Sequence, residues 1–166
     1  MNMPKKGFTL IELIMILLIL GILSTVIVTG LVSSLNTAKI EAAKFKLKSD
    51  IIYAQGLAIT QQLNHGVIFD TGLETYSVYK ETTANIVNNP LTGVPFIVNY
   101  NTDPDLKGIN LVSANFGSPT TNRVEFNNLG IPSDGNVTLS VNGSVSISYS
   151  GLDGTVAVTK NTGMVN

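Results

Sequence analysis

A single acidic side chain stands inside a long apolar run near the N-terminus of the chain. Between Gly7 and Lys39 the only charged residue is Glu12, and the rest of residues 8–32 is apolar or small. A carboxylate placed in hydrocarbon costs on the order of 2.5–3.5 kcal/mol on insertion scales. A neighbouring cation would offset that penalty, and cleavage after Gly7 would create one, the α-amine of Phe8, four residues before Glu12. We therefore interpret Glu12 as a residue that acts in an assembled state.

The apolar run is long enough to be a membrane segment. Residues 8–32 exceed the roughly 20 apolar residues that cross a bilayer, and Lys5 and Lys6 in front of them predict a cytoplasmic N-terminus. Two simpler interpretations compete with this one. A secretory signal peptide would have a shorter apolar run, of roughly 7–15 residues, followed by a cleavage site. A plain membrane anchor explains the length of the run but not Glu12.

The residues around Gly7 resemble the processing site of type IV prepilins and of the pseudopilins of type II secretion. The matching features are a short basic leader, a Gly7-Phe8 pair and a glutamate, Glu12, as the fifth residue after the leader. The resemblance implies that a membrane prepilin peptidase cleaves between Gly7 and Phe8 and then N-methylates Phe8. It also implies that Glu12 forms an assembly salt bridge with the Phe8 amine of a neighbouring subunit.

Behind the apolar run, the pattern predicts that the helix continues to about Leu63. Apolar residues recur at steps of three and four, and we expect them on the buried side of the helix: Ile40, Ala43, Leu47, Ile51, Ala54 and Ala58. The lysines of this segment fall mostly on the remaining surface, which we interpret as a solvated face near anionic lipid. Gly21 and Gly30 are the weak points of the helix, and the sequence Asn64-His65-Gly66 is expected to end it.

Beyond residue 66 the apolar pattern has a period of two, which predicts strands. Turn residues separate the runs, with hairpin candidates at residues 70–72 and at Asn142-Gly143. A further turn at residues 150–154 leads to a last strand. We therefore predict an antiparallel β meander packed on the second half of the helix.

The head resembles the GspH/FimT-like minor pilins and pseudopilins. The resemblance lies in residues 42–80, 124–130, 145–151 and 155–158, the last two of which look like the closing hairpin of that family. It implies a minor subunit at or near the tip of a filament. Some FimT-like members bind DNA through a basic C-terminal stretch, but the last 40 residues of this chain contain only one basic residue, Lys160. DNA is therefore not an expected partner.

The head offers little for catalysis. Residues 64–166 carry eight acidic and four basic residues, a balance of −4, which does not favour phosphate binding. The chain has no cysteine, and its single histidine, His65, is interpreted as a partner of the helix dipole. Asp103 and Asp105 flank a proline, where they could bind Ca²⁺ or simply cap a turn. We expect no catalytic residues, no metal and no cofactor.

These observations predict an α+β, type IV pilin-like fold, in which a long N-terminal helix packs on an antiparallel β-sheet head. The expected division is a prepilin leader peptide at residues 1–7, a transmembrane or filament-core helix at 8–35 and a periplasmic or extracellular head at 36–166. The head is expected to contain an amphipathic helix at 36–63 and antiparallel strands over 66–160.

The predicted function is structural rather than enzymatic. We expect a minor, tip-proximal subunit of a type II secretion pseudopilus or a type IV pilus, crossing the bacterial inner membrane once with a cytoplasmic N-terminus before assembly. The expected partners are the prepilin peptidase, other pilin or pseudopilin subunits, inner-membrane lipid, the assembly platform protein and a secreted substrate. Two alternatives are a tip module that binds exoprotein or DNA for uptake, and a membrane-anchored enzyme.

Overall fold

The computed structural model describes residues 7–117, 122–134 and 137–166, without the side chains of residues 25–29 and 134. The predicted leader residues 1–6 therefore lie outside the described residues, as do Gly135 and Asn136. Contacts along the chain divide it into two units, Met1–Thr37 and Ala38–Asn166.

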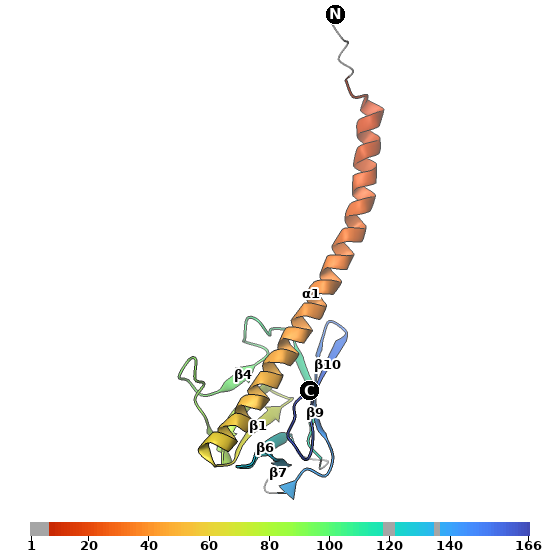
Figure 1. The fold of residues 1–166 in the computed structure, drawn as a ribbon. Coiled ribbons are helices and arrows are strands. Elements are labelled where there is room, and N and C mark those ends of the chain that lie inside the picture. The colour runs from red at the N-terminus through yellow and green to blue at the C-terminus, as the bar shows by residue number, and fades with distance from the viewer. Residues whose placement is uncertain (1–6, 118–121, 135–136) are drawn as a thin grey trace, which may run out of the picture. The chain divides into compact units, whose positions relative to one another are not determined.

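A single long helix, α1, covers Leu10–Gln61 (Figure 1). It contains no proline, and Gly21 and Gly30 do not interrupt it. The helix ends two residues before the predicted Leu63, because Gln62 takes a left-handed backbone conformation with φ of 57°. A residue in that conformation is a common way to end a helix.

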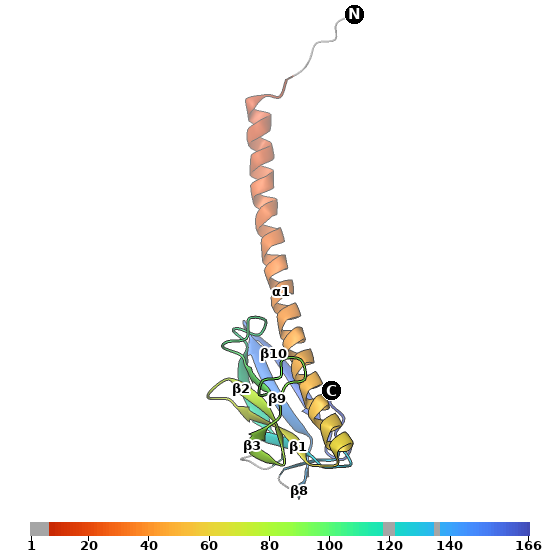
Figure 2. The same cartoon turned by 90° about the vertical axis from the view of Figure 1, so that its left-hand side faces the viewer.

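The strands of the head form two antiparallel sheets, and they lie to one side of α1 (Figure 2). The larger sheet has the order β3-β2-β1-β6-β7-β8, with β4 paired to β2. Its strands are β1 (His65–Asp70), β2 (Thr75–Lys80), β3 (Thr82–Ile86), β4 (Ile97–Asn99), β6 (Arg123–Phe126), β7 (Pro132–Asp134) and β8 (Val137–Thr138). The smaller sheet has the order β10-β9-β5 and consists of β5 (Asn110–Asn115), β9 (Gly143–Tyr149) and β10 (Leu152–Val158).

Two of the predicted hairpins are present. Asp70 Oδ1 accepts hydrogen bonds from the backbone N–H groups of Gly72 and Leu73, both at 2.9 Å, and so closes the β1–β2 turn. The β9–β10 turn is tighter than predicted, because Ser150 and Gly151 both have positive φ and Tyr149 pairs directly with Leu152. Two such residues in a row form the turn that matches the twist of a two-stranded ribbon.

The predicted simple meander is wrong. β1 pairs with β6 as well as with β2, and β5 pairs with β9, so strands far apart in sequence are neighbours. The predicted hairpin at Asn142-Gly143 is also absent, because β8 pairs with β7 in the other sheet. Gly143 instead begins β9, where a Cβ atom would collide with the Phe116 ring. Glycine at this position allows close packing against Phe116 and does not form a turn.

The core of the head lies between α1 and the sheets. The predicted stripe is confirmed, since all six of its residues are buried: Ile40, Ala43, Leu47, Ile51, Ala54 and Ala58. They pack with aromatic residues of the strands, among them Phe69, Tyr76 and Phe126. Burying a Leu or Ile side chain contributes about 1.5–3 kcal/mol, so this stripe fastens the second half of α1 to the head.

A small polar cluster is enclosed in this core. Asp50, which is 6 % exposed, accepts hydrogen bonds from the Tyr76 hydroxyl at 2.6 Å and from Lys46 Nζ at 2.5 Å. Burial raises the pKa of Tyr76 well above its ordinary value, and the negative charge of Asp50 raises it further. The pKa of Tyr100 is also raised, first by burial and then by the charge of Asp50. The two tyrosines are therefore held in their neutral form.

Candidate processing and assembly site

Glu12 lies in the first turn of α1, where it forms a reciprocal capping arrangement with Thr9. The backbone N–H of Glu12 donates to Thr9 Oγ1 at 3.3 Å, and the backbone N–H of Thr9 donates to Glu12 Oε2 at 3.4 Å. The Thr9 hydroxyl also lies 3.5 Å from Glu12 Oε2. This is the capping box of a helix N-terminus, in which each side chain accepts a hydrogen bond from the other residue's backbone.

The capping box holds the Glu12 carboxylate at the end of the helix that faces Phe8. The side chain remains exposed, so the carboxylate is accessible to a partner while it caps the helix. Negative charge in the first turn is also favourable toward the helix dipole. The sequence reasoning did not recognise the role of Thr9, although the spacing Thr-x-x-Glu before an apolar run is a known signature of a helix start.

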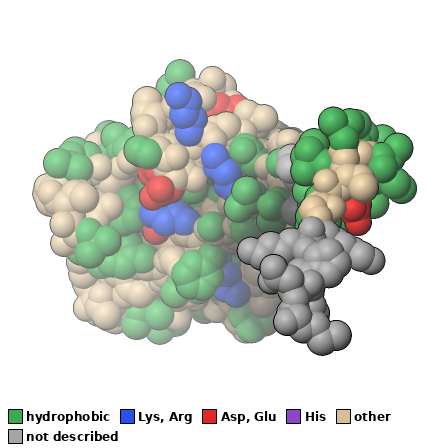
Figure 3. Space-filling model, turned by 90° about the horizontal axis from the view of Figure 1, so that it is seen from above, with side chains coloured by type: hydrophobic (Ala, Val, Ile, Leu, Met, Phe, Trp, Pro, Cys, Tyr) green, Lys and Arg blue, Asp and Glu red, His purple; other side chains and the backbone are tan. Residues whose placement is uncertain are grey.

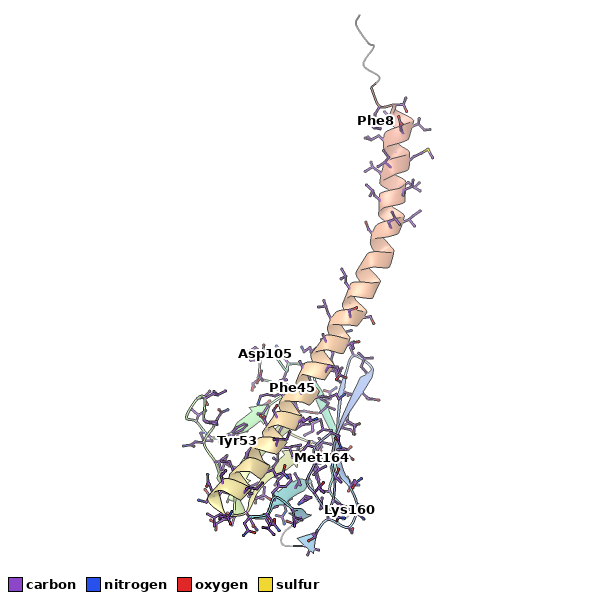
Figure 4. The ribbon with its side chains drawn as sticks, viewed as in Figure 1. Phe8, Phe45, Tyr53, Asp105, Lys160 and Met164 are labelled. Carbon is purple, nitrogen blue, oxygen red and sulfur yellow. The ribbon has the colours of Figure 1, made fainter. Side chains whose placement is uncertain are left out.

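Gly7 and Phe8 precede the helix and are accessible. Phe8 is 77 % exposed, and a Cβ atom at Gly7 would find no other atom within 4 Å. A side chain at residue 7 would therefore meet no obstacle among the described residues. Figure 4 places Phe8 at the beginning of α1.

The first turns of α1 expose apolar side chains in every direction. From Leu10 to Leu23 the leucine, isoleucine and methionine side chains are all exposed, and Figure 3 shows the hydrophobic surface that they form. A helix that is apolar on all sides is typical of a segment covered by lipid or by other helices. Over the residues that the structure describes, no helix combines the length and the apolar character required to cross a membrane.

The second half of α1 also carries an exposed apolar stripe beside its buried one. Phe45, Ile52 and Ile59 recur every seven residues and are 72 %, 46 % and 45 % exposed. Between them on the same side lie the small residues Ser49 and Gly56, and nothing lies within 4 Å of a Cβ atom built at Gly56. Large side chains spaced by seven residues, with small ones between them, are a surface into which another helix can pack. Phe45 is labelled on the helix in Figure 4.

The turn at Asp103 and Asp105 is closed by its own hydrogen bonds. The Asp105 backbone N–H donates to Asp103 Oδ1 at 3.0 Å, and the Asp103 backbone N–H donates to the carbonyl of Asn99 at 2.9 Å. Among the described residues, no group of three or more acidic or histidine side chains could hold a metal ion. The sequence left two interpretations of this turn open, a Ca²⁺ site and a capped turn, and the observed hydrogen bonds are those of a capped turn.

The single histidine lies inside the head rather than at the end of α1. His65 is the first residue of β1 and is fully buried, with Nδ1 3.0 Å from the carbonyl oxygen of Leu63. Its interpretation as a partner of the helix dipole is therefore wrong. In the larger sheet, His65 of β1 pairs with Phe126 of β6.

Comparison with known proteins gives a family model for the N-terminal segment and similar solved structures over about three quarters of the chain. Residues 2–28 match the family model of the prokaryotic N-terminal methylation motif. No curated protein sequence matches the chain.

The fold of the head is found in solved structures. The minor pseudopilin EpsH of the type II secretion system of Vibrio cholerae is similar with a TM-score of 0.54 and 13 % identity, over 76 % of this chain and 93 % of that one. The type IV minor pilin FimU of Pseudomonas aeruginosa is similar with a TM-score of 0.54 and 11 % identity, over 78 % of this chain and 88 % of that one.

The chain thus combines the N-terminal methylation motif with a type IV pilin-like fold, in which a long helix packs on an antiparallel head. The similarity to the minor pseudopilin EpsH and the minor pilin FimU supports the predicted resemblance to GspH/FimT-like subunits, and at 13 % and 11 % identity it is a similarity of fold. The predicted fold class and the predicted prepilin-type N-terminus are thereby confirmed.

Proposed function

We propose that this chain is a structural subunit, minor and near the tip, of a type II secretion pseudopilus or a type IV pilus. The observation that carries the proposal is the methylation motif over residues 2–28, joined to a helix whose first acidic residue is Glu12. The similar proteins are a minor pseudopilin and a minor pilin, which supports a role in a filament rather than in catalysis.

In this proposal the prepilin peptidase removes residues 1–7 and methylates the new N-terminus at Phe8. The exposure of Phe8 and the open space around Gly7 support access by the enzyme. Cleavage leaves a positively charged primary α-amine on Phe8, and its methylation to a secondary amine keeps that charge. Nothing else in the reaction requires a side chain of this chain, so its own residues act only as the substrate.

Glu12 then pairs with the Phe8 amine of a neighbouring subunit. The capping box supports this role, because Thr9 fixes the first turn and leaves the Glu12 carboxylate exposed beside the end of the helix. An ion pair in a low-dielectric surrounding needs both partners, and a lone carboxylate there would be strongly unfavourable. Assembly thus offsets the free-energy cost of holding the Glu12 carboxylate in lipid, a cost that a single subunit cannot avoid.

Residues 8–35 form the transmembrane segment before assembly and part of the filament core after it, and residues 36–166 form the head outside the inner membrane. The apolar composition of residues 8–32 and the two lysines before them support this orientation. The assembly platform protein would draw the subunit from the membrane into the filament. Phe45, Ile52 and Ile59 would then pack against the helix of an adjacent subunit.

Substitution of Glu12 tests the proposal. Glu12→Ala should be cleaved as efficiently as the wild type, yet its incorporation into filaments should fall at least tenfold in a strain that expresses the other subunits. Glu41→Ala is a matched control, since Glu41 is an exposed acid on the same helix, 3.0 Å from Lys44 Nζ. Normal incorporation of Glu12→Ala, or an equal loss with Glu41→Ala, would contradict the assembly role of Glu12.

A further inference from the structure

A polar cavity of about 620 Å³ lies between the segment that follows α1 and strands of the larger sheet. It is bordered by the segment that follows α1, by β2 and the start of β3, and by β6. The residues that matter for its chemistry are Gln62, Asn64, Glu81, Thr82, Arg123 and Glu125. None of them belongs to the N-terminal segment, so this cavity is separate from the assembly site described above.

The floor of the cavity is a buried carboxylate held in a fixed position. Glu125 is only 5 % exposed, and its two oxygens accept hydrogen bonds from different elements. The Asn64 side-chain amide donates to Oε1 at 3.1 Å, and the Tyr79 hydroxyl donates to Oε2 at 3.2 Å. These two hydrogen bonds offset part of the cost of burying the carboxylate and fix its orientation.

Gly66 makes this arrangement possible. It lies on β1 between the strands that carry Tyr79 and Glu125, pairing with both of them. A Cβ atom at Gly66 would lie 2.6 Å from the Tyr79 hydroxyl and 2.6 Å from the end of its ring. The absence of a side chain at residue 66 therefore lets the Tyr79 ring cross the strand and reach the carboxylate.

The charges around the cavity favour a cation. Glu81 adds a second carboxylate, and Arg123 is the basic residue among the described residues that line the cavity. The C-terminal end of α1 contributes further negative potential, since the last turn of the helix contains no basic residue. The two carboxylates and the helix end together outweigh the single guanidinium.

We propose that this cavity binds a lysine or arginine side chain of a partner protein. Hydroxyl and amide groups beside the carboxylates, on Thr82 and Gln62, can accept further hydrogen bonds from an ammonium or a guanidinium group. The cavity opens to solvent between exposed residues, Gln62, Glu81 and Thr82. An open cavity holds a free amine poorly, whereas a side chain is held in place by the rest of its protein.

A peptide titration tests this inference. The full chain, labelled with ¹⁵N in detergent micelles, is titrated with acetyl-Gly-Ser-Arg-Ser-Gly-amide and with the same peptide carrying neutral citrulline in place of arginine. The arginine peptide should shift the backbone amide signals of Glu81, Thr82 and Glu125 saturably, and the citrulline peptide should bind at least tenfold more weakly. Both peptides have nearly the same shape, so the difference isolates the charge.

Variants locate the binding site. Glu81→Gln should weaken binding of the arginine peptide at least fivefold, and because Glu81 is exposed its substitution should not disturb the fold. Glu125→Gln should do the same, with retained near-ultraviolet circular dichroism as the check on folding. Asp153→Asn is the matched control, since Asp153 is an exposed acid on β10 outside the cavity, and it should bind like the wild type.

Several results would overturn the inference. These are the absence of saturable shifts, equal binding of the citrulline peptide, and unchanged binding by Glu81→Gln. Methylguanidinium that binds as tightly as the arginine peptide would contradict a protein partner and indicate a site for a small cation instead. The titration does not depend on cleavage after Gly7 or on assembly, so its failure would leave the proposed function untouched.

Discussion

The two halves of α1 have the same secondary structure but opposite surroundings. Up to residue 24 the helix exposes apolar side chains on every side, and its one charged residue, Glu12, is hydrogen-bonded within the first turn. From Ala38 onward it buries one stripe against two sheets and exposes the other side. The second half is therefore stabilised by the chain's own head, whereas the first half exposes the apolar side chains that the proposed function assigns to contacts with lipid and other subunits.

This difference predicts that processing and assembly depend on the first half of α1, whereas the stability of the head depends on the second half. Substitutions in the N-terminal segment should change processing and assembly while the head stays folded. Substitutions in the buried stripe should unfold the head. The exposed stripe of Phe45, Ile52 and Ile59 combines both properties. It lies on the half of α1 that packs on the head, but its apolar side chains are exposed like those of the first half.

The largest expected effect is at the predicted cleavage site. Gly7→Val should abolish processing, because the resemblance to prepilins implies a peptidase that requires a small residue before the bond that it cleaves. No described residue crowds Gly7, so the head should fold normally. Immunoblotting of membranes from cells that contain the peptidase should show only the precursor.

Gly21→Val provides the matched control for that experiment. Gly21 lies within α1, also without neighbouring atoms, and its substitution should leave cleavage intact. Processing of Gly7→Val at the wild-type rate would contradict the assignment of the cleavage site.

The next effect contrasts two neighbouring positions on α1. Leu47→Ala should reduce the free energy of unfolding of the head by about 2–5 kcal/mol, because Leu47 is completely buried. Phe45→Ala should change it by less than about 0.5 kcal/mol, since Phe45 is 72 % exposed. All five tyrosines of the chain lie in the head, so urea unfolding followed by tyrosine fluorescence reports on the head alone.

The same pair also separates stability from assembly. Phe45→Ala should reduce incorporation into filaments despite its normal stability, if the exposed stripe packs against another helix. A destabilised head in Phe45→Ala, or normal incorporation of this variant, would contradict the division between the two sides of α1.

Alkaline pH provides a smaller test that concerns only the head. Tyr76 and Tyr100 have raised pKa values in the folded chain, so the unfolded chain loses these protons first as the pH rises. The folded state then binds more protons than the unfolded one, and stability falls with pH above the ordinary tyrosine pKa of about 10. The slope should be about 1.4 kcal/mol per pH unit for each tyrosine that stays protonated.

Tyr76→Phe should remove the contribution of one tyrosine to this pH dependence of stability. At neutral pH the variant should lose about 1–2 kcal/mol, since Asp50 loses the hydrogen bond from the hydroxyl. Between about pH 9 and pH 11 its stability should decline less steeply than that of the wild type. Urea unfolding followed by far-ultraviolet circular dichroism measures both effects, and an unchanged slope would contradict the enclosed tyrosine cluster.

The smallest expected effect is at the helix start. Thr9→Ala removes the hydroxyl that accepts from the Glu12 backbone, which should destabilise the first turn by about 1 kcal/mol. Hydrogen exchange of the backbone amides of Glu12 and Leu13 in detergent should become faster by about fivefold to tenfold. Exchange in the head should be unaffected, and a change there would contradict the independence of the two regions.

The sequence carries the N-terminal methylation motif more directly than it carries the strand pairing of the head, for a physical reason. Around Gly7 and Glu12 the information lies in the spacing of a few neighbouring residues, which can be read directly. In the head, the pairing of β1 with β6 and of β5 with β9 depends on contacts between distant segments, which local patterns do not encode. The buried stripe of α1 was predictable because a helix repeats its contacts every three or four residues.

Other features of the head could not be predicted from the sequence, because the same residue type occurs in several kinds of local structure. Asn142-Gly143 has the composition of a hairpin turn, but the glycine is needed for the approach of Phe116. Glu125 has the appearance of a surface acid in an alternating strand, and only the crossing of Tyr79 over Gly66 explains its burial. Such close approaches are properties of the folded chain.

The mass of the N-terminus in the cell tests the central claim most directly. The chain is extracted from membranes that contain the prepilin peptidase, and its intact mass and N-terminal fragments are measured by mass spectrometry. The account predicts a chain that begins at Phe8 and carries one methyl group on its α-amine, with Glu12 as its fifth residue. Retention of Met1, or cleavage behind the apolar run after residue 30, would contradict it.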